Sequence, residues 1–263
     1  MKTLGATNGR AKAGTFAPAP GRAPLGRMLG AQSAMEIRLT LRRGESLLLT
    51  LVIPVLLLIG VSQTSVVRLP GGSRIDFLAP GVLALAVMST AFTGQAISTG
   101  FERSYGVLKR LGASALSRRD LLIAKTLAVL AVIALQVLVV ALVAVALGWR
   151  PAVSGLPSAL ALLLLGAASF SGLGLLMAGT LRAEATLAGA NLVYLLMLAV
   201  GGVMFAMPGG IDRILEFLPV NALVDGLRSV LSHGGWGPGR VWLVLAVWAA
   251  ASIAAAARWF RWE

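Results

Sequence analysis

The side chains that could carry catalysis or bind a metal are few and scattered. The 263-residue chain has one histidine, His233, and no cysteine, and its ten acidic residues all lie outside the long apolar runs. A catalytic site, a metal site or a proton relay within a membrane would need such groups clustered or buried in the apolar segments. No GxxxxGK[ST] phosphate-binding motif occurs either. The sequence therefore predicts that the chain is not an enzyme and binds no metal or cofactor of its own.

Charged residues concentrate in one island, Phe101 to Lys125, which lies between two apolar runs. Its aromatic and apolar residues Phe101, Tyr105 and Leu108 recur at spacings of four and three. This spacing predicts a short helix with an apolar stripe, a form that suits docking on a partner. A basic loop beside a membrane can also be only a topology signal that contacts anionic lipid headgroups. Composition alone leaves both interpretations open.

A second group consists of polar residues inside otherwise apolar runs. The candidates for lining a transport pathway are Thr93, Gln95, Gln136, Asn191 and Tyr194. Such residues more often form hydrogen bonds between packed membrane helices, so that alternative stays open for each of them. A mostly apolar, uncharged pathway would favour a hydrophobic or amphipathic substrate over a small ion.

The composition indicates the elements that must position these residues. Hydrophobic residues make up 57% of the chain and charged residues 13%, which is typical of an integral membrane protein. Six uncharged runs have the length of membrane-spanning helices: 46–62, 77–100, 126–147, 157–180, 187–206 and 241–257. Their uniform apolarity excludes a membrane barrel, in which polar and apolar residues alternate. Small residues four apart, Ala168 with Gly172 and Gly174 with Ala178, predict close helix packing.

The distribution of basic residues predicts the topology. With the N-terminus inside, 17 Lys and Arg residues lie on the inner side and six on the outer side, so both termini are expected in the cytoplasm. Residues 1–27 read as a disordered cytoplasmic tail and residues 28–263 as a transmembrane domain. Leu29 to Arg43 fits a helix lying in the membrane interface. The net charge of +13 is explained by this topology, and no interleaving of aromatic and basic residues indicates nucleic-acid binding.

The longest external segment, Met207 to Arg240, is not simply polar. Two apolar stripes at helical spacing predict two short helices there, a helical hairpin between spans 5 and 6. The first stripe comprises Ile211, Ile214, Leu215 and Leu218, and the second comprises Leu223, Leu227, Val230 and Leu231.

Three stretches resemble type-2 ATP-binding-cassette (ABC) exporter permeases. ERSYGVLKRLGASALSRRDLLIAK is similar to the cytoplasmic loop between spans 2 and 3, MEIRLTLRRGESLLLTLVIP to the interfacial helix and first span, and GGVMFAMPGGIDRILEFLPVNALVDGLRSVL to the turn after span 5. Among subgroups, the chain looks most like the daunorubicin-resistance-type drug-efflux permeases of actinobacteria. The resemblance implies an all-α integral membrane fold with six spans, an interfacial helix, a cytoplasmic coupling helix and an external helical hairpin that caps the pathway.

The resemblance also implies a function and partners. The chain would be the permease of an ATP-driven exporter of hydrophobic or amphipathic, drug-like molecules in the cell membrane, or alternatively of lipids or lipid-linked polysaccharides. ATP and Mg would bind two copies of a separate ABC ATPase subunit, and a second permease copy would complete a homodimer among membrane lipids. The residues expected to contact the ATPase are Phe101, Glu102, Arg103, Tyr105, Gly106, Leu108, Lys109 and Arg110. An intramembrane enzyme lacks its catalytic groups here, and the coupling loop argues against a passive channel or scaffold.

Overall fold

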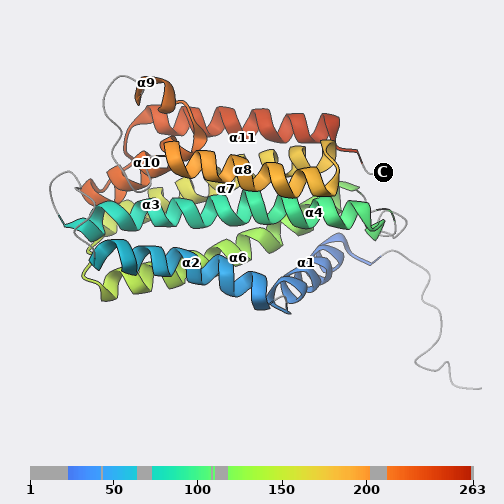
Figure 1. Cartoon of the computed structure of the whole chain (residues 1–263), viewed down its shortest axis with the longest axis horizontal. Helices are drawn as coiled ribbons and strands as arrows, with labels where there is room; N and C mark the ends of the chain where they lie inside the picture. Colours follow the sequence, from blue (N-terminus) through green and yellow to red (C-terminus); the bar gives the residue numbers. More distant parts are fainter. Residues whose placement is uncertain are drawn as a thin grey trace, which may run out of the picture.

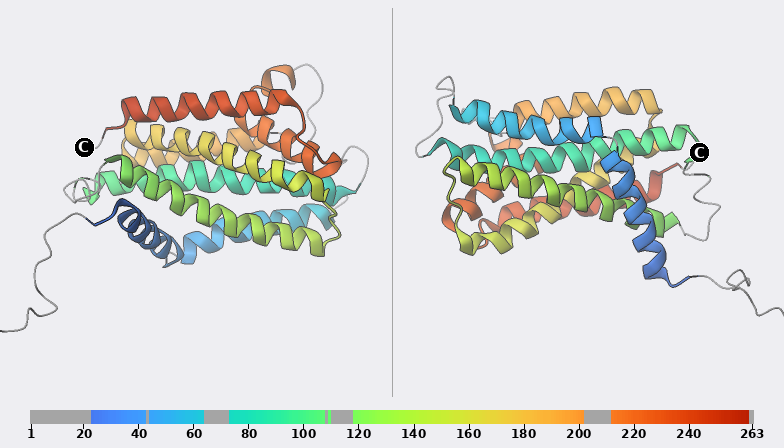
Figure 2. Two further views of the ribbon diagram at one scale, coloured as in Figure 1. Left: turned by 180° about the vertical axis from the view of Figure 1, so that it is seen from behind. Right: turned by 90° about the horizontal axis from the view of Figure 1, so that it is seen from below.

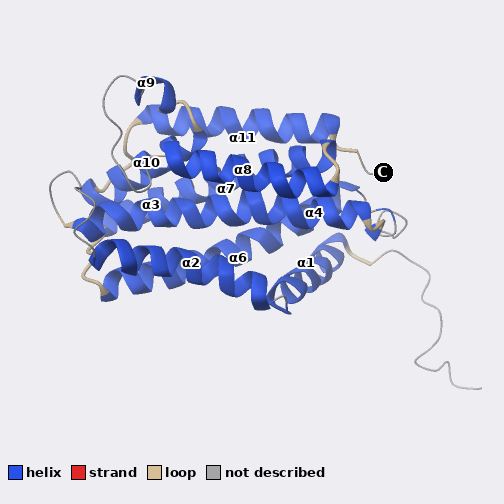
Figure 3. Ribbon diagram, in the orientation of Figure 1, coloured by secondary structure: helices blue, strands red, loops and turns tan. Residues whose placement is uncertain are grey.

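A computed structural model describes residues 23–42, 44–63, 73–107, 109, 118–201 and 212–261. Across these ranges the chain forms helices and turns without strands (Figure 3). This confirms the predicted all-α fold class. Most of the predicted tail, residues 1–22, lies outside the described ranges.

The bundle is organised around one long rod of three helical segments, α3 (Arg74–Met88), η1 (Ser89–Gly94) and α4 (Gln95–Ser104). The rod is 31 residues long, and 83% of its most apolar window is buried, against 17% for that of α8. It therefore lies at the centre of the bundle (Figure 1). The helices around it are α2 (Gly44–Gln63), α6 (Arg118–Ala146), α7 (Leu156–Thr180, preceded by the short turn η2, Val153–Gly155) and α8 (Ala183–Val200).

Small residues let α7 approach both α11 (Gly239–Trp259) and the central rod. A Cβ added at Gly172 would lie 2.2 Å from Oγ of Ser252, and one added at Gly174 would lie 2.8 Å from the carbonyl oxygen of Phe92. The hydroxyl of Ser252 donates to the Ser169 carbonyl at 3.1 Å, which adds a hydrogen bond across the same contact. Close packing at Gly172 and Gly174 is thus confirmed.

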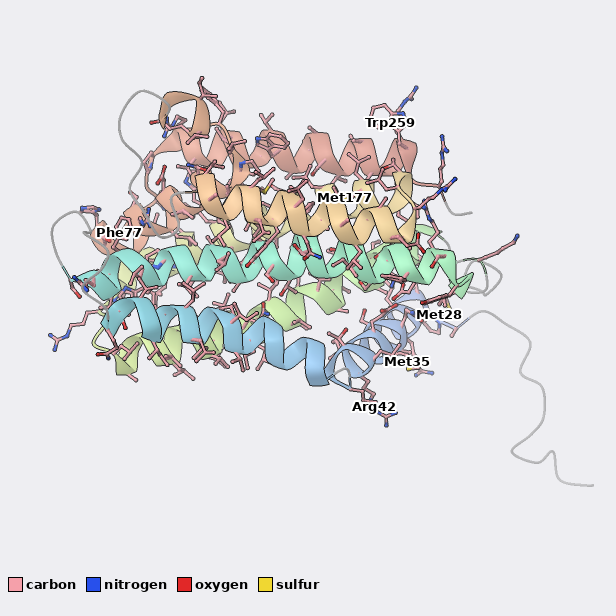
Figure 4. The ribbon with its side chains drawn as sticks, in the orientation of Figure 1. Met28, Met35, Arg42, Phe77, Met177 and Trp259 are labelled. Atoms are coloured by element: carbon pink, nitrogen blue, oxygen red, sulfur yellow. The ribbon has the colours of Figure 1, made fainter. Side chains whose placement is uncertain are left out.

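Helix α1 (Leu25–Arg42) lies across α6 on the outside of the bundle (Figure 2). Oγ of Ser33 donates to the Ala124 carbonyl at 3.3 Å, while Met35 and Arg42 point away from the bundle (Figure 4). An exposed apolar side chain beside an exposed cation suits a helix at a membrane surface. The helix predicted from Leu29 is present and begins at Leu25, and its place in the interface stays a prediction.

The predicted hairpin contains α9 (Asp212–Leu215) and α10 (Pro219–His233). The predicted stripe of α10 is buried, and α10 packs against α3, α7 and α11. Arg228 fixes it further, because its guanidinium lies 3.6 Å from the ring centroid of Phe77 and its Nε donates to the Phe77 carbonyl at 3.2 Å. Burial lowers the pKa of Arg228 to about 10, so the side chain is still cationic at neutral pH. Helix α10 is therefore part of the packed bundle, and the predicted role of the hairpin as an external cap of the pathway stays a prediction.

The helices alternate in direction, so connections gather at two ends (Figures 1 and 2). One end, here called the Tyr105 end, holds the N-terminal end of α1, the end of α4, the start of α6, the α7–α8 turn and the described C-terminal residues. The opposite end, here called the α10 end, holds the end of α2, the α6–α7 connection, α9 and α10. The segments predicted to be cytoplasmic thus share one end, although which side of a membrane that end faces stays a prediction.

Within the described residues, five stretches are long and apolar enough to cross a membrane. They are Arg74–Ser104, Ile123–Ala146, Val153–Thr180, Ala183–Val200 and Gly239–Trp259, and each contains most of one predicted span. The apolar part of α2, Leu51–Gln63, is shorter. The predicted first span at 46–62, and with it the six-span layout, therefore stays a prediction.

Candidate functional site

A groove of about 770 Å³ opens beside the second half of the central rod. Its walls come from α1, η1, α4 and α6, with Asn191 of α8 on one side. Polar residues of the rod follow one another along it, from Ser89 in η1 to Glu102 near the end of α4. The groove therefore runs from the interior of the bundle to the Tyr105 end.

The rod changes its winding where the groove begins, since Ser89–Gly94 form π-helical turns between two α-helices. π-Helical turns are uncommon and are often found at functional sites. In this stretch Oγ1 of Thr90 donates to Oε1 of Gln136 at 2.7 Å, and the side chain of Ser89 is hydrogen-bonded to Tyr194. Helix α7 also packs closely against η1, because Gly174 lies against the backbone of Phe92.

The five predicted pathway residues divide into two sets. Thr93, Gln95 and Asn191 line the groove. Gln136 and Tyr194 are not among its lining residues, and they instead form the hydrogen bonds to Thr90 and Ser89. Their observed role is the interhelical bonding that is common in membrane helices. A pathway role for any of the five stays a prediction.

The predicted coupling segment continues the same rod. The rings of Phe101 and Tyr105 stack with centroids 5.9 Å apart, and Tyr105 is 70% exposed. The α-helix ends at Ser104, and Gly106 has φ of +68°, a backbone conformation that glycine adopts without strain. Both aromatic residues also line the mouth of the groove. Lys109 is exposed, while Leu108 and Arg110 lie outside the described residues.

Glu102 points back into the bundle and forms an ion pair with Lys125 of α6. Nζ of Lys125 also lies 3.1 Å from Oε1 of Glu36 in α1. Lys125 is only 5% exposed, and the two carboxylates compensate the cost of burying its ammonium group. The cluster joins α1, α4 and α6 at the Tyr105 end.

Arg103 faces the other way and binds the end of α7. Its Nη1 donates to the Gly179 carbonyl at 2.7 Å, and its Nη2 donates to the Leu181 carbonyl. Cationic side chains favour helix C-termini, where carbonyl groups lack partners within the helix. The amide of Arg261 donates to the same Gly179 carbonyl at 3.1 Å. Arg103 therefore fastens α4 to the α7–α8 turn.

Sequence reasoning did not single out Ser98 or Thr99, and it did not predict the pairing of Lys125 with Glu36 and Glu102. A signal for Thr99 was available, because it follows Gln95 by four residues and so shares its helix face. The pairing of Glu36 with Lys125 joins residues 89 positions apart, and no local pattern indicates it. No group of three or more potential metal ligands occurs in the part of the chain that the structure describes.

An all-helical bundle with several membrane-length apolar helices and a groove among them defines a multi-pass membrane protein. A family model described as ABC-2 family transporter protein matches residues 68–258. The match covers well over half of the chain, so the protein belongs to the ABC-2 transporter family. Membrane components of this family are transport subunits and pair with an ATP-binding subunit. A search among curated proteins gives no match.

Proposed function

We propose that the chain is the permease of an ATP-driven exporter that moves hydrophobic or amphipathic, drug-like molecules outward across the cytoplasmic membrane. In this proposal the Tyr105 end faces the cytoplasm. Two permease copies form a homodimer, and two ATPase subunits that bind ATP and Mg²⁺ dock on the coupling segment. The daunorubicin-resistance type of drug efflux is the subgroup that we favour.

One observation carries the proposal: a single rod joins a stacked aromatic pair, of which Tyr105 is exposed and Phe101 is partly buried, to the groove. Phe101 and Tyr105 present a stacked apolar surface at the end of α4, with Glu102 between them turned inward. The helix-in-groove mode of recognition uses such anchors, spaced along one helix face. Thr93 and Gln95 lie on the same rod and line the groove. A movement imposed at Tyr105 would therefore reach the groove wall through continuous helix.

The contacts of α4 support such transmission. Glu102 is paired with Lys125 on one side, and Arg103 is bonded to the α7–α8 turn on the other. Because α4 is held on both sides, a partner that displaces its end must also move α1, α6 or the end of α7. Helices α1, α4 and α6 are walls of the groove, so docking would change its shape.

The lining of the groove favours hydrophobic or amphipathic substrates. Its residues include apolar side chains such as Ile97, Val129 and Val132, together with uncharged polar ones. Small-molecule sites combine mostly apolar walls with a few placed polar groups. A lipid or lipid-linked polysaccharide exporter of the same family is the second candidate, because a helix α1 lying in the membrane interface would bring the groove mouth level with lipid headgroups.

Binding of an ATPase subunit to the permease in lipid nanodiscs tests the proposal. Truncation of a buried aromatic anchor typically costs about 2 kcal/mol, so Tyr105→Ala should weaken ATPase binding roughly thirtyfold. Trp259→Ala is the matched control, since it removes another exposed aromatic residue from the same end of the bundle (Figure 4). It should leave the affinity unchanged. Equal affinities for wild type and Tyr105→Ala, or no ATPase binding to either, would refute the proposal.

A further inference from the structure

Three polar side chains of the groove have hydrogen-bonding atoms without a partner among the described residues. They are Oγ1 of Thr93, Oγ1 of Thr99 and both Oε1 and Nε2 of Gln95. Gln95 is 3% exposed and Thr99 is 1% exposed, so bulk water does not satisfy them. Buried polar groups in folded proteins are nearly always hydrogen-bonded, which makes this concentration in one groove unusual.

Helix packing does not account for these three residues. Thr90, one turn earlier on the same rod, does find an interhelical partner in Gln136. Gln95 and Thr99 are four residues apart on α4 and so share a helix face, and that face is a wall of the groove. Their unpartnered atoms therefore lie in the wall of the groove, each exposing less than 1 Å² of surface, and a rotation of the side chain would bring them to a bound molecule.

The chemistry of Gln95 narrows the class of molecule. Its carboxamide offers an acceptor oxygen and an NH₂ donor side by side in one plane, and neither has a partner among the described residues. A primary amide satisfies both at once, because its carbonyl oxygen and one of its N–H bonds point the same way, whereas in a trans secondary amide they point in opposite directions. Gln95 can meet such a group whichever way its amide is turned, because neither end has a partner among the described residues.

We propose that the groove is a binding site for amphiphiles that carry a neutral primary amide group, with Gln95 facing the amide and the Thr99 hydroxyl beside it. This inference rests on the proposed export function, for which it names the substrate class. The apolar chain of the ligand would lie along Ile97, Val129 and Val132. At the mouth, Glu36 and Glu102 place two carboxylates against the one ammonium of Lys125, which disfavours an anionic headgroup.

The absence of cysteine makes a direct binding test possible. Ser98 lines the groove and is partly exposed, so Ser98→Cys in full-length permease in nanodiscs should react with methyl methanethiosulfonate. The two probes are dodecanamide, a primary amide, and methyl dodecanoate, the methyl ester of the same acid. Because only the amide can donate to Gln95, it should slow labelling at a roughly tenfold lower concentration than the ester.

Two variants in the Ser98→Cys background test whether Gln95 and Thr99 cause the preference for the amide. Gln95→Leu and the nearly isosteric Thr99→Val should each raise the amide concentration needed to slow labelling until it is close to the ester concentration. Thr180→Val, at the exposed end of α7, should not. A cysteine at Ser232, at the α10 end, should be labelled at the same rate with and without either probe. Equal protection by the two probes, protection by neither, or full amide preference in both groove variants would overturn the proposal.

This test is separate from that of the proposed function. Labelling uses the permease alone, so amide-selective protection would support the binding site even if no ATPase subunit associated. If an ATPase binds through Tyr105 but the amide gives no selective protection, the exporter assignment stands and the amide site is wrong.

Discussion

Lys125 lies buried at the start of α6 between Glu36 of α1 and Glu102 of α4. Removing one member of a buried ion cluster leaves the others without compensation, at a cost of about 3–5 kcal/mol. We therefore expect Lys125→Met to lower the thermal unfolding temperature of the detergent-solubilised protein markedly.

A matched control separates charge from packing in that experiment. The triple variant Lys125→Met, Glu36→Gln and Glu102→Gln keeps the volume of the cluster and removes all three charges. It should recover much of the lost stability, because apolar or neutral replacements of buried ion pairs are often well tolerated. If the single and triple variants unfold at the same temperature, the cluster contributes through side-chain volume and not through charge.

At the same scale, sequence reasoning placed some residues better than others. Thr93 and Gln95 were predicted to face a pathway and do line the groove, whereas Gln136 and Tyr194 bond to neighbouring helices. All four are polar residues in apolar runs, so composition cannot divide them. The division depends on which residues meet across the contacts between helices, and no local sequence pattern predicts those contacts.

At the scale of elements, the contact between α7 and η1 sets the shape of the rod. A Cβ at Gly174 would lie 2.8 Å from the Phe92 carbonyl oxygen, closer than such atoms normally approach. Gly174→Ala should therefore force the two segments apart and destabilise the protein by about 1–3 kcal/mol.

Gly189→Ala is the matched control, since it also replaces a helical glycine but would meet its nearest neighbour at 3.7 Å. It should be neutral or slightly stabilising, because alanine favours helix more than glycine does. Thermal unfolding of both variants measures the difference. Equal stability of the two would show that α7 and η1 can separate without cost.

Helices could be predicted from the sequence where apolar residues recur at helical spacing along one face. The stripe from Leu223 to Leu231 correctly predicted a helix, and that helix is α10. Its position was less predictable, because an apolar stripe says that a face will be buried but not against which helices. Contacts between α10 and α3 join segments about 150 residues apart, as the Arg228 to Phe77 hydrogen bond does.

At the scale of the whole molecule, the two ends of the bundle should lie on opposite sides of a membrane. Ser104 at the Tyr105 end and Ser232 at the α10 end are both exposed. Single cysteines at these positions should react differently with an impermeant thiol reagent added to intact cells, with only the Ser232→Cys variant labelled. Permeabilised cells provide the control, since both variants should then react. Labelling of both from outside would contradict the predicted topology.

The C-terminal residues adjoin the coupling end through one shared acceptor, the carbonyl of Gly179. It accepts hydrogen bonds from the Arg103 side chain and from the backbone amide of Arg261. An affinity tag or fluorescent protein fused after residue 263 would therefore be separated from Arg261 by only two residues. Such a fusion would pull on the carbonyl that orients Arg103 and would crowd the surface around Tyr105. Purification and reporter fusions for this protein are better placed before α1, where Ala23 and Pro24 are exposed.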